Sequence, residues 1–541
     1  MDVEELAAKG GELNGCAYYA ARRAAQQAEI LLMPYSSLLH EETRKLLGVR
    51  LSGSVIVLDE AHNVGEAVSA SYSAAVTQHH LEIACSALKN YIDRFRSRLG
   101  PSNLRHLSML YEVASCLQRT IESSSSSIME GLYDFVKRAE IHNIDVFRLT
   151  NFVRESKILL KLSNYGEYVE DSNLNSKDEE ASALSALQSL TSFISALGSS
   201  ESDGRILIEL NSCEEKTQRQ LKYLLVDSSS RFVSLASDAR AIIFAGGTLS
   251  PTEALLNQLV PNIRASRVVR TLTCGHIVPD GNLLCCALAS GPTGYSLNFS
   301  FKRRDFQATD ELGRVVLNMC KIAPGGIVVF LPSFQYMQSV IERWHSNGTI
   351  SALKKHKNLH WEPRSASEVE QTLSSHASDA NESHHGALLL CVVGAKLSEG
   401  VNFADATGRC IILAGLPYPS PNDVELRERM RFHDELKRKA NDEGRPDASE
   451  LPSGRDLYES LCSRAVNQAV GRAIRHVNDW AAVVLADERF AASEGDGARS
   501  RLSDWMAKSL KVPRTFGEFC RVSAAFFKGK RTKGENVSWV H

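Results

Sequence analysis

The sequence SVIVLDEAHN, at residues 54–63, constrains the fold more than any other stretch of the chain. Its apolar residues Val55 to Leu58 are followed at once by Asp59, Glu60, a small residue and His62. A short continuous apolar run predicts a strand of a parallel sheet that is covered on both faces. Ligands of such sheets bind beyond the carboxyl ends of the strands, where Asp59 and Glu60 would lie. One carboxylate can hold Mg²⁺ while its neighbour orients or deprotonates a water for phosphoryl transfer; a strand that simply ends in solvated acids is the alternative.

Length and composition limit the class of protein. A chain of 541 residues is too long for one core and predicts roughly three or four domains. Hydrophobic residues make up 43% of it and charged residues 23%, as in soluble globular proteins. The formal net charge of -2 gives no global attraction to nucleic acid, so such binding needs local basic patches. Scattered cysteines without a C-x-x-C pair, and apolar runs well short of about 20 residues, predict a soluble intracellular protein.

The apolar pattern changes character twice along the chain. Strand patterns at Ile30–Met33, Val55–Leu58 and Ala241–Ala245 predict a first sheet, and helical periodicity predicts an insertion within it. Further strand patterns after residue 273 predict a second sheet with helices between most of its strands. They are Leu283–Leu288, Ile327–Leu331, Ala387–Val393, Cys410–Ala414 and Ala482–Ala486. We therefore predict an α/β fold with two parallel-sheet domains, divided at residues 1–64, 65–205 (the helical insertion), 206–272 and 273–541.

Polar turns follow several of these predicted strands. Gly247 and Thr248 lie in a tight turn whose backbone amides can approach a phosphate, although an ordinary strand–loop junction is favoured for this turn alone. Ser398, Glu399 and Gly400 would form a polar loop at the ligand edge, and Ser333 takes the equivalent place on another strand.

The segment between Trp344 and Gly386 is polar and holds six histidines. His356 and His360 are four residues apart, but no pair shows the helical H-x-x-x-H pattern with an adjacent acid that zinc enzymes use. We interpret this segment as a solvated loop rather than a metal site.

The segment NQAVGRAIRH predicts a helix with one basic face. Gln468, Arg472 and Arg475 are spaced four and three residues apart and would share that face. Two arginines on one face of a packed helix suit phosphate oxygens. The alternative is a surface helix with salt bridges; Gly471 and Gln468 are unusual choices for such a helix.

Together, D-E-A-H, G-G-T, S-E-G and Q-x-x-G-R-x-x-R, in this order, resemble the motifs of superfamily 2 helicases. Their wider context resembles the XPD-type iron–sulfur DEAH helicases, and within them the ChlR branch, the DEAD/H-box helicase 11 group. The resemblance covers residues 14–500 and rests on the segments LLMPYSSLLH, VIVLDEAHN, AIIFAGGTLSP, VVFLPSFQYM, GAKLSEGVNF, GLPYPSP and QAVGRAIRH.

The resemblance implies two RecA-like domains with a nucleotide cleft between them, the first carrying the insertion as an arch domain. Asp59 would then coordinate Mg²⁺, Glu60 would activate the attacking water, and His62 would couple the nucleotide to the rest of the site. Gly247 and Thr248 would link ATP hydrolysis to movement along the strand.

The second domain would complete the site. The resemblance implies that Gln468, Arg472 and Arg475 reach the nucleotide, with at least one arginine acting as a finger on the γ-phosphate. Ser333 and the loop of Ser398, Glu399 and Gly400 would lie near the DNA or the cleft. The family unwinds DNA 5′ to 3′ in the nucleus, and this branch serves sister-chromatid cohesion and genome maintenance. The implied partners are single-stranded and forked DNA together with cohesion and replication-fork proteins, with no membrane.

Two departures from the family pattern limit what the resemblance implies. No G-x-x-x-x-G-K-[ST] phosphate loop occurs in the sequence, although the family uses one to grip ATP. Cys16 matches the last of the four cysteines that hold the family's 4Fe-4S cluster, and no cysteine precedes it. We therefore expect an N-terminally truncated helicase without a cluster. Two interpretations stay open: an incomplete form of an ATP-dependent DNA helicase, or a short protein that binds nucleic acid or a partner without hydrolysing ATP.

Overall fold

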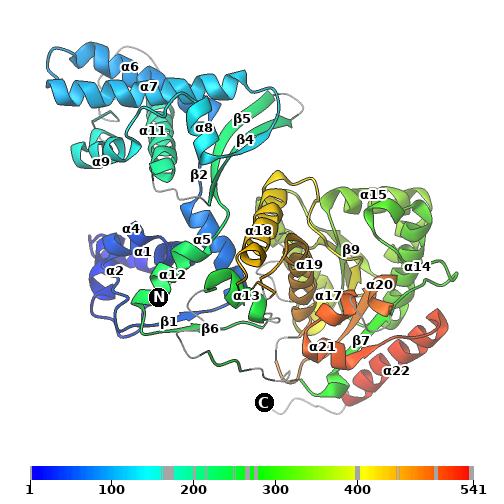
Figure 1. Ribbon diagram of the computed structural model, residues 1–541. Helices are drawn as coiled ribbons and strands as arrows, with labels where there is room; N and C mark the ends of the chain where they lie inside the picture. Colours follow the sequence, from blue (N-terminus) through cyan, green and yellow to red (C-terminus); the bar gives the residue numbers. More distant parts are fainter. Residues whose placement is uncertain are drawn as a thin grey trace. The chain divides into compact units, whose positions relative to one another are not determined.

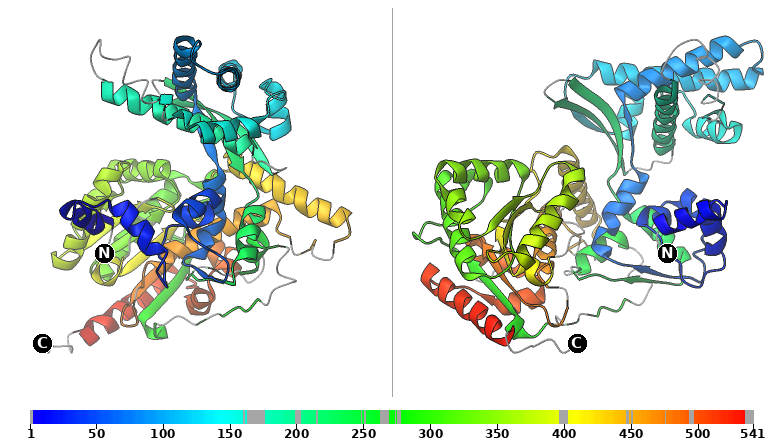
Figure 2. Two further views of the ribbon diagram at one scale, coloured as in Figure 1. Left: turned by 90° about the vertical axis from the view of Figure 1, so that its left-hand side faces the viewer. Right: turned by 180° about the vertical axis from the view of Figure 1, so that it is seen from behind.

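The computed structural model describes most of the chain, in segments separated by short gaps. The described residues are 3–159, 161–162, 176–198, 203–213, 216–247, 249, 252–261, 269–272, 274, 278–395, 403–445, 448–449, 451–474, 476–492 and 497–534. They form two compact units (Figures 1 and 2). Unit 1 comprises residues 1–246, 254–268 and 424–432, and unit 2 comprises residues 247–253, 269–423 and 433–541. Within the described residues, no helix is long and apolar enough to cross a membrane.

The first part of unit 1 is built on a small parallel sheet of two strands, β1 (Val55–Leu58) and β6 (Ala241–Phe244). The helices of this part are α1 (Val3–Glu12), α2 (Ala17–Ala25), α3 (Tyr35–Leu39), α4 (Glu41–Leu47), α5 (Val64–Tyr72), α12 (Ser229–Asp238) and α13 (Thr252–Leu259), with the 3-10 turn η1 (Ala61–Asn63). The predicted strand at Ile30–Met33 is wrong. This segment carries no strand, and the Ile30 and Leu32 side chains are 83% and 92% exposed, because no neighbouring strand pairs with it.

The insertion in unit 1 is a mixed α/β element rather than an all-helical one. Its helices are α6 (Gln78–Phe95), α7 (Pro101–Ser123), α8 (Leu132–Arg138), α9 (Val146–Ser156) and α11 (Ser176–Gly198). They accompany a four-stranded antiparallel sheet in the order β2-β5-β4-β3, formed by Ala74–Thr77, Lys216–Leu225, Gly204–Cys213 and Ile128–Gly131. The hairpin of β4 and β5 therefore continues the insertion beyond the predicted boundary at residue 205. Helical periodicity in the sequence predicts α6 and α7. The sequence did not predict the four strands, because their residues do not show that periodicity.

Unit 2 is organised around a seven-stranded, all-parallel sheet in the order β13-β7-β12-β11-β8-β10-β9. Its strands are β7 (Leu283–Leu288), β8 (Ile327–Leu331), β9 (Asn358–Trp361), β10 (Ala387–Val392), β11 (Cys410–Ala414), β12 (Ala481–Ala486) and β13 (Leu510–Lys511). The five predicted strands are all present. The two that the sequence did not predict, β9 and β13, are the edge strands, which are short and lack a continuous apolar run.

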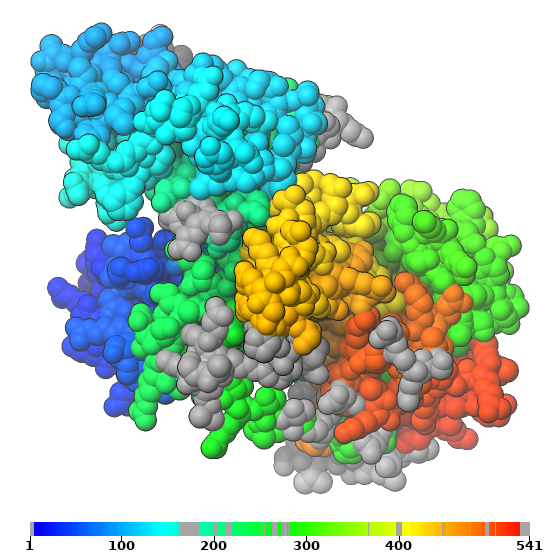
Figure 3. All heavy atoms as spheres, in the orientation of Figure 1, coloured from blue at the N-terminus to red at the C-terminus, as the bar shows by residue number. Residues whose placement is uncertain are grey.

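Helices cover both faces of this sheet. They are α14 (Phe306–Ile322), α15 (Phe334–Ser346), α16 (Thr349–Lys354), α17 (Ala366–Glu382), α19 (Gly454–Gly471), α20 (Glu488–Ala491), α21 (Asp504–Ser509) and α22 (Phe516–Gly534). A further helix, α18 (Val424–Asp442), is divided between the two units. The 3-10 turns are η2 (Asp280–Asn282), η3 (Phe301–Arg303), η4 (Asp405–Gly408) and η5 (Ala498–Arg501). The charged helix α18, whose first half groups with unit 1, lies at the surface (yellow to orange in Figure 3).

The core of unit 2 explains why its central strands are unbroken apolar runs in the sequence. Alternate residues of β8 enter two separate hydrophobic clusters, with Val329 in one and Val328 and Phe330 in the other. All five residues of β8 are fully buried, as in a parallel sheet that is covered on both faces.

The histidine-rich segment is also part of this fold. The predicted solvated loop is wrong, because residues 345–386 form the end of α15 and all of α16, β9 and α17. His376 is 1% exposed, and its Nε2 atom lies 2.9 Å from the carbonyl oxygen of Thr407.

Candidate nucleotide site

The candidate site of unit 1 lies at the carboxyl ends of β1 and β6. Leu58 and Phe244 are register partners, and two backbone hydrogen bonds extend the pairing. Ala245 donates to the Leu58 carbonyl oxygen at 2.9 Å, and Ala61 donates to the Ala245 carbonyl oxygen at 2.9 Å. The turn that carries Asp59 and Glu60 is therefore tied to the end of the neighbouring strand, where sheets of this kind bind ligands.

The backbone turns sharply between the two acids. Glu60 has a left-handed backbone with φ of 50°, which costs a non-glycine residue about 1–3 kcal/mol and is typical of functional sites. The turn leaves the Glu60 carboxylate 60% exposed, whereas His62 is 6% exposed. Glu60 Oε2 lies 3.3 Å from His62 Nδ1, so the buried imidazole contacts the exposed carboxylate. This contact fits the coupling role predicted for His62.

Tyr35 is a further residue of this site, which the sequence did not predict. Its hydroxyl donates a hydrogen bond to the Asp59 carbonyl oxygen. Burial, followed by the negative charges of Asp59 and Glu60, raises the pKa of Tyr35. The contact depends on the packing of α3, so only the tertiary structure places this side chain beside the acids.

The two carboxylates fit a divalent cation. Asp59 is exposed, and its Oδ1 atom accepts a hydrogen bond from the Glu60 amide at 3.1 Å. Among the described residues, no lysine or arginine forms an ion pair with Asp59 or Glu60. Mg²⁺ prefers one or two carboxylate oxygens together with water and substrate phosphates. Asp59 is the residue of this pair that would hold it.

Several predicted site residues lie outside the described residues. These are Thr248, Ser398, Glu399, Gly400 and Arg475. Gly247 lies in a turn that follows β6. The space beside it is open, because a Cβ atom at this position would meet no atom within 4 Å.

Two of the predicted nucleotide-contacting residues of unit 2, Gln468 and Arg472, lie at the end of helix α19. Gln468 is on α19, which ends at Gly471, and Arg472 is its C-cap residue with φ of -79°. Of the predicted helix face of Gln468, Arg472 and Arg475, the helix itself carries Gln468, Arg472 lies at its C-cap, and Arg475 lies outside the described residues. Gly471 favours that end, since glycine is a poor helix former.

Ser333 is the N-cap residue of α15, directly after β8. Its Oγ atom accepts a hydrogen bond from the Tyr336 amide at 3.2 Å. The hydroxyl can still donate, so its capping role is compatible with the predicted contact to DNA.

The iron–sulfur cluster of the family does not fit the cysteines of this chain. Cys16 is an exposed residue at the start of α2. Within the described residues it belongs to no group of metal-binding side chains. A 4Fe-4S cluster needs a full thiolate set, of which Cys16 could supply one ligand.

One other cluster has the composition of a metal site. It consists of Asp405, His476 and Asp479. Arg409 Nη1 lies 2.7 Å from Asp479 Oδ1 and its guanidinium group stacks over Trp480 at 4.1 Å. The arginine already balances the buried carboxylate, so we interpret the cluster as a structural ion network.

Comparisons with known proteins agree with this arrangement. A family model described as DEAD_2 matches residues 1–81, and one described as Helicase C-terminal domain matches residues 316–509. A solved XPD helicase structure superposes with a TM-score of 0.52 and 16% identity, covering 94% of this chain and 77% of its own, which shows a shared fold. The ATP-dependent DNA helicase CHL1 of Aspergillus clavatus is 31% identical over 94% of this chain and 70% of its own length.

The chain belongs to the DDX11/CHL1 family. The ATP-dependent DNA helicase DDX11 of Danio rerio is 35% identical over 98% of this chain. The chain spans 64% of the length of that relative. The predicted resemblance to XPD-type helicases of the DDX11 branch and the predicted α/β fold with RecA-like domains are thus confirmed.

Proposed function

We propose that this chain is part of an ATP-dependent DNA helicase that couples ATP hydrolysis to movement on single-stranded DNA. The observation that carries this proposal is the Asp59–Glu60 pair at the carboxyl end of β1, held by β6 and uncompensated by any lysine or arginine among the described residues. Relatives that match over most of the chain are named as ATP-dependent DNA helicases.

This geometry supports the roles that we propose for the acids and the histidine of unit 1. When bound, Mg²⁺ would neutralise charge on the phosphates of ATP. Asp59 would hold it through a carboxylate oxygen, and Glu60 would orient the attacking water and accept its proton. His62, in contact with Glu60, would couple the state of that carboxylate to the buried interior. Gly247 and Thr248, which follow β6 in the sequence, would link hydrolysis to movement along the DNA strand.

The motifs of unit 2 would contact the nucleotide and the DNA. Gln468, Arg472 and Arg475 would reach the nucleotide, with one arginine stabilising charge on the γ-phosphate. Glu399 and Gly400 would line the nucleotide site, while Ser333 and Ser398 would contact DNA. We further propose movement in the 5′ to 3′ direction, a nuclear location, and a role in sister-chromatid cohesion and DNA repair on forked substrates.

The missing phosphate-loop pattern supports a second candidate function. Without G-x-x-x-x-G-K-[ST], the lysine and backbone amides that grip the β- and γ-phosphates have no counterpart in this sequence. A chain of this kind would bind single-stranded nucleic acid or a partner protein without hydrolysing ATP.

Steady-state phosphate release with and without single-stranded DNA separates the two candidates. The helicase function predicts DNA-stimulated turnover that Glu60→Gln lowers by about 100-fold or more, because the water loses its general base. Glu41→Gln is the matched control, since Glu41 is an exposed acid of the same unit that forms a surface salt bridge with Lys45.

DNA binding without any ATP turnover would contradict the helicase function and support the non-hydrolysing one. Turnover that survives Glu60→Gln would remove the proposed role of this residue. The intact mass of the endogenous protein, compared with 59.5 kDa for this chain, shows whether it carries further sequence that could supply a phosphate loop.

A further inference from the structure

One loop of unit 2 presents an aromatic ring and two cations to solvent. Between β7 and α14 the chain forms η3, Phe301–Arg303. Phe301 is 89% exposed, more than any other phenylalanine among the described residues. Lys302 and Arg303 are also exposed, and Arg303 has one long ion pair, with Glu488 at 3.7 Å. A single exposed apolar side chain is common at protein surfaces. The distinctive feature of this loop is that an exposed ring and two exposed cations are adjacent on one short turn.

Hydrogen bonds hold the backbone of this loop on both sides of Phe301. The Phe299 amide donates to Asp487 Oδ2 at 3.1 Å, and Asp487 is 0% exposed. Arg304 Nε donates to the Phe299 carbonyl oxygen at 2.7 Å. Glu488 accepts hydrogen bonds from the side chains of two earlier loop residues, Ser296 and Asn298. The exposed ring therefore stands on a turn with a defined conformation.

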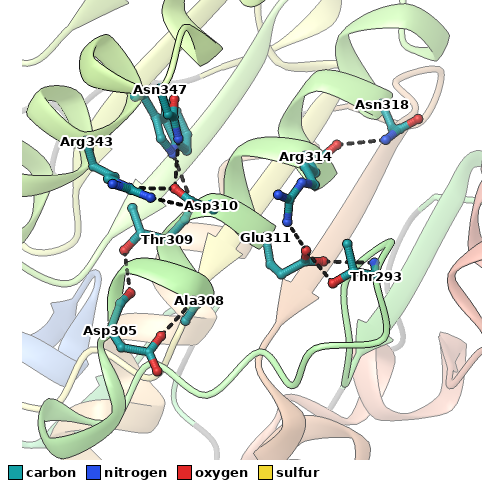
Figure 4. Close-up of polar contacts among 11 residues, drawn as sticks. Thr293, Asp305, Ala308, Thr309, Asp310, Glu311, Arg314, Asn318, Arg343 and Asn347 are labelled. Carbon is teal, nitrogen blue, oxygen red and sulfur yellow. Dashed lines mark hydrogen bonds and ion pairs between the residues drawn. The ribbon is translucent and has the colours of Figure 1, made fainter.

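Helix α14 anchors the rest of the loop, as Figure 4 shows. Asp305 caps this helix by accepting from the Ala308 amide at 2.7 Å. Glu311, which is 1% exposed, accepts from the amide and the hydroxyl of Thr293 at 3.2 and 2.7 Å. A buried carboxylate used in this way fixes the start of the loop to the helix that follows it.

The neighbouring residue Phe306 is also exposed, but its ring has a partner within the protein. Phe306 is 70% exposed, but the Arg343 guanidinium group lies over its ring at 5.0 Å. Arg343 is itself held by Asp310 through two hydrogen bonds of 2.8 and 2.7 Å (Figure 4). The Phe306 ring thus has a partner within the protein, whereas Phe301 directs most of its surface to solvent.

The loop shares its surface with the start of α15. The Arg304 guanidinium group lies over the Tyr336 ring at 5.1 Å, and the Phe299 and Tyr336 rings are 6.3 Å apart. Tyr336 is also the residue whose amide Ser333 caps. The loop is therefore anchored on the same helical turn that carries the predicted DNA contact, and the positive end of α15 favours phosphate there.

We propose that Phe301, Lys302 and Arg303 form a stacking platform for single-stranded DNA, in which one base stacks on Phe301 and the two cations contact the flanking phosphates. Stacking on an aromatic ring beside basic side chains is how proteins bind single strands without sequence preference. A fixed backbone lowers the entropy lost on binding. The proposal rests on the proposed function, whose DNA contacts it deepens; a peptide partner of acidic and aromatic character is the other occupant that the test distinguishes.

The first test measures binding of the full chain to an oligothymidine by fluorescence anisotropy. Phe301→Ala is expected to weaken binding by about 10- to 100-fold, the effect of losing one stacked base. Tyr133→Ala, which removes a 79% exposed aromatic ring of α8, is the matched control and leaves affinity unchanged. Because Phe301 is so exposed, the melting temperature of Phe301→Ala should equal that of the parent chain.

The second test uses Phe301→Trp as a reporter. A base stacked on the introduced indole quenches its fluorescence when the oligothymidine binds. Combined Lys302→Gln and Arg303→Gln substitutions should reduce the slope of log affinity against log salt by up to about 1.4, or about 0.7 for each phosphate that no longer meets a cation. Lys354→Gln with Lys355→Gln, an exposed pair at the end of α16, is the control and leaves the slope unchanged.

The outcomes separate the two proposals. A parent chain that does not bind single-stranded DNA overturns the proposed function and the platform with it. A parent chain that binds, with Phe301→Ala binding equally well and the Phe301→Trp indole unquenched, overturns the platform alone and makes a protein partner the occupant to seek.

Discussion

At the scale of single residues, buried polar side chains determine how the histidine-rich segment folds. Lys357 is 2% exposed, and its Nζ atom donates to the carbonyl oxygens of Ala323 and Gly325 at 3.0 and 2.7 Å. His360 Nε2 lies 2.8 Å from Asp379 Oδ2, and His376 lies against Thr407. Lys357 and His376 join the segment to other parts of unit 2, and the His360–Asp379 contact joins β9 to α17. Polar residues that suggest a solvated loop in the sequence are therefore structural.

His376 makes stability depend on pH. Burial is the main cause that lowers its pKa to about 4, and the neighbouring His360 and Lys357 add to it, whereas the Thr407 carbonyl and Asp379 oppose it. The unfolded chain has an ordinary histidine pKa of about 6.5 and binds the proton more readily, so stability falls as pH decreases from about 6.5 to 4. The expected loss at pH 5 is roughly 2 kcal/mol.

Urea unfolding at pH 7 and pH 5, carried out on the parent chain and on His376→Gln, measures how much His376 contributes to the pH dependence of stability. The parent chain should lose more stability than His376→Gln over that interval, because only the parent has the buried imidazole. Equal losses in both proteins would show that His376 does not contribute to the pH dependence.

At the scale of elements, a glycine pair sets the start of the central strand β8. The Gly326 amide donates to the Ala406 carbonyl oxygen at 2.6 Å, and Gly325 has a left-handed backbone with φ of 60°. A Cβ atom on Gly326 would lie 2.1 Å from the Thr407 carbonyl oxygen. The turn η4 therefore packs directly against the backbone that enters the sheet, a close approach that only glycine permits.

Gly326→Ala is expected to destabilise unit 2 by about 3 kcal/mol or more, because backbone rather than a flexible side chain must move. Gly529→Ala on α22, where a Cβ atom meets nothing within 4 Å, is the matched control. It should be neutral or stabilising by up to about 1 kcal/mol, since alanine is the better helix former. Chemical denaturation of the two variants checks the prediction, and similar stabilities for both would contradict it.

At the scale of the whole molecule, the two parallel sheets differ in how well they are covered. In unit 1, Val55 and Val57 of β1 are 51% and 61% exposed, and Ile243 of β6 is 50% exposed. In unit 2, every residue of β8, β10, β11 and β12 is buried. A two-stranded sheet with one bare face is marginal, whereas a sheet covered on both faces is the stable core of its unit.

Hydrogen exchange measured by mass spectrometry should reflect this difference. Peptides that contain β1 and β6 are expected to exchange well before peptides that contain β8 and β11, because opening free energies follow burial and packing. Equal protection of the two sheets would mean that unit 1 is stabilised by something other than the contacts described above.

The sequence by itself determined the family, the α/β class and the five continuous strands of unit 2, because unbroken apolar runs and motifs in fixed order are local signals. It also placed Asp59 and Glu60 directly after a strand. The tertiary structure decided what depends on distant partners: that Ile30–Met33 forms no strand, that the β4–β5 hairpin belongs to the insertion, and that α19 stops at Gly471. It alone brought Tyr35 to the acids and fixed the loop of Phe301, since these contacts join residues that are far apart in the chain.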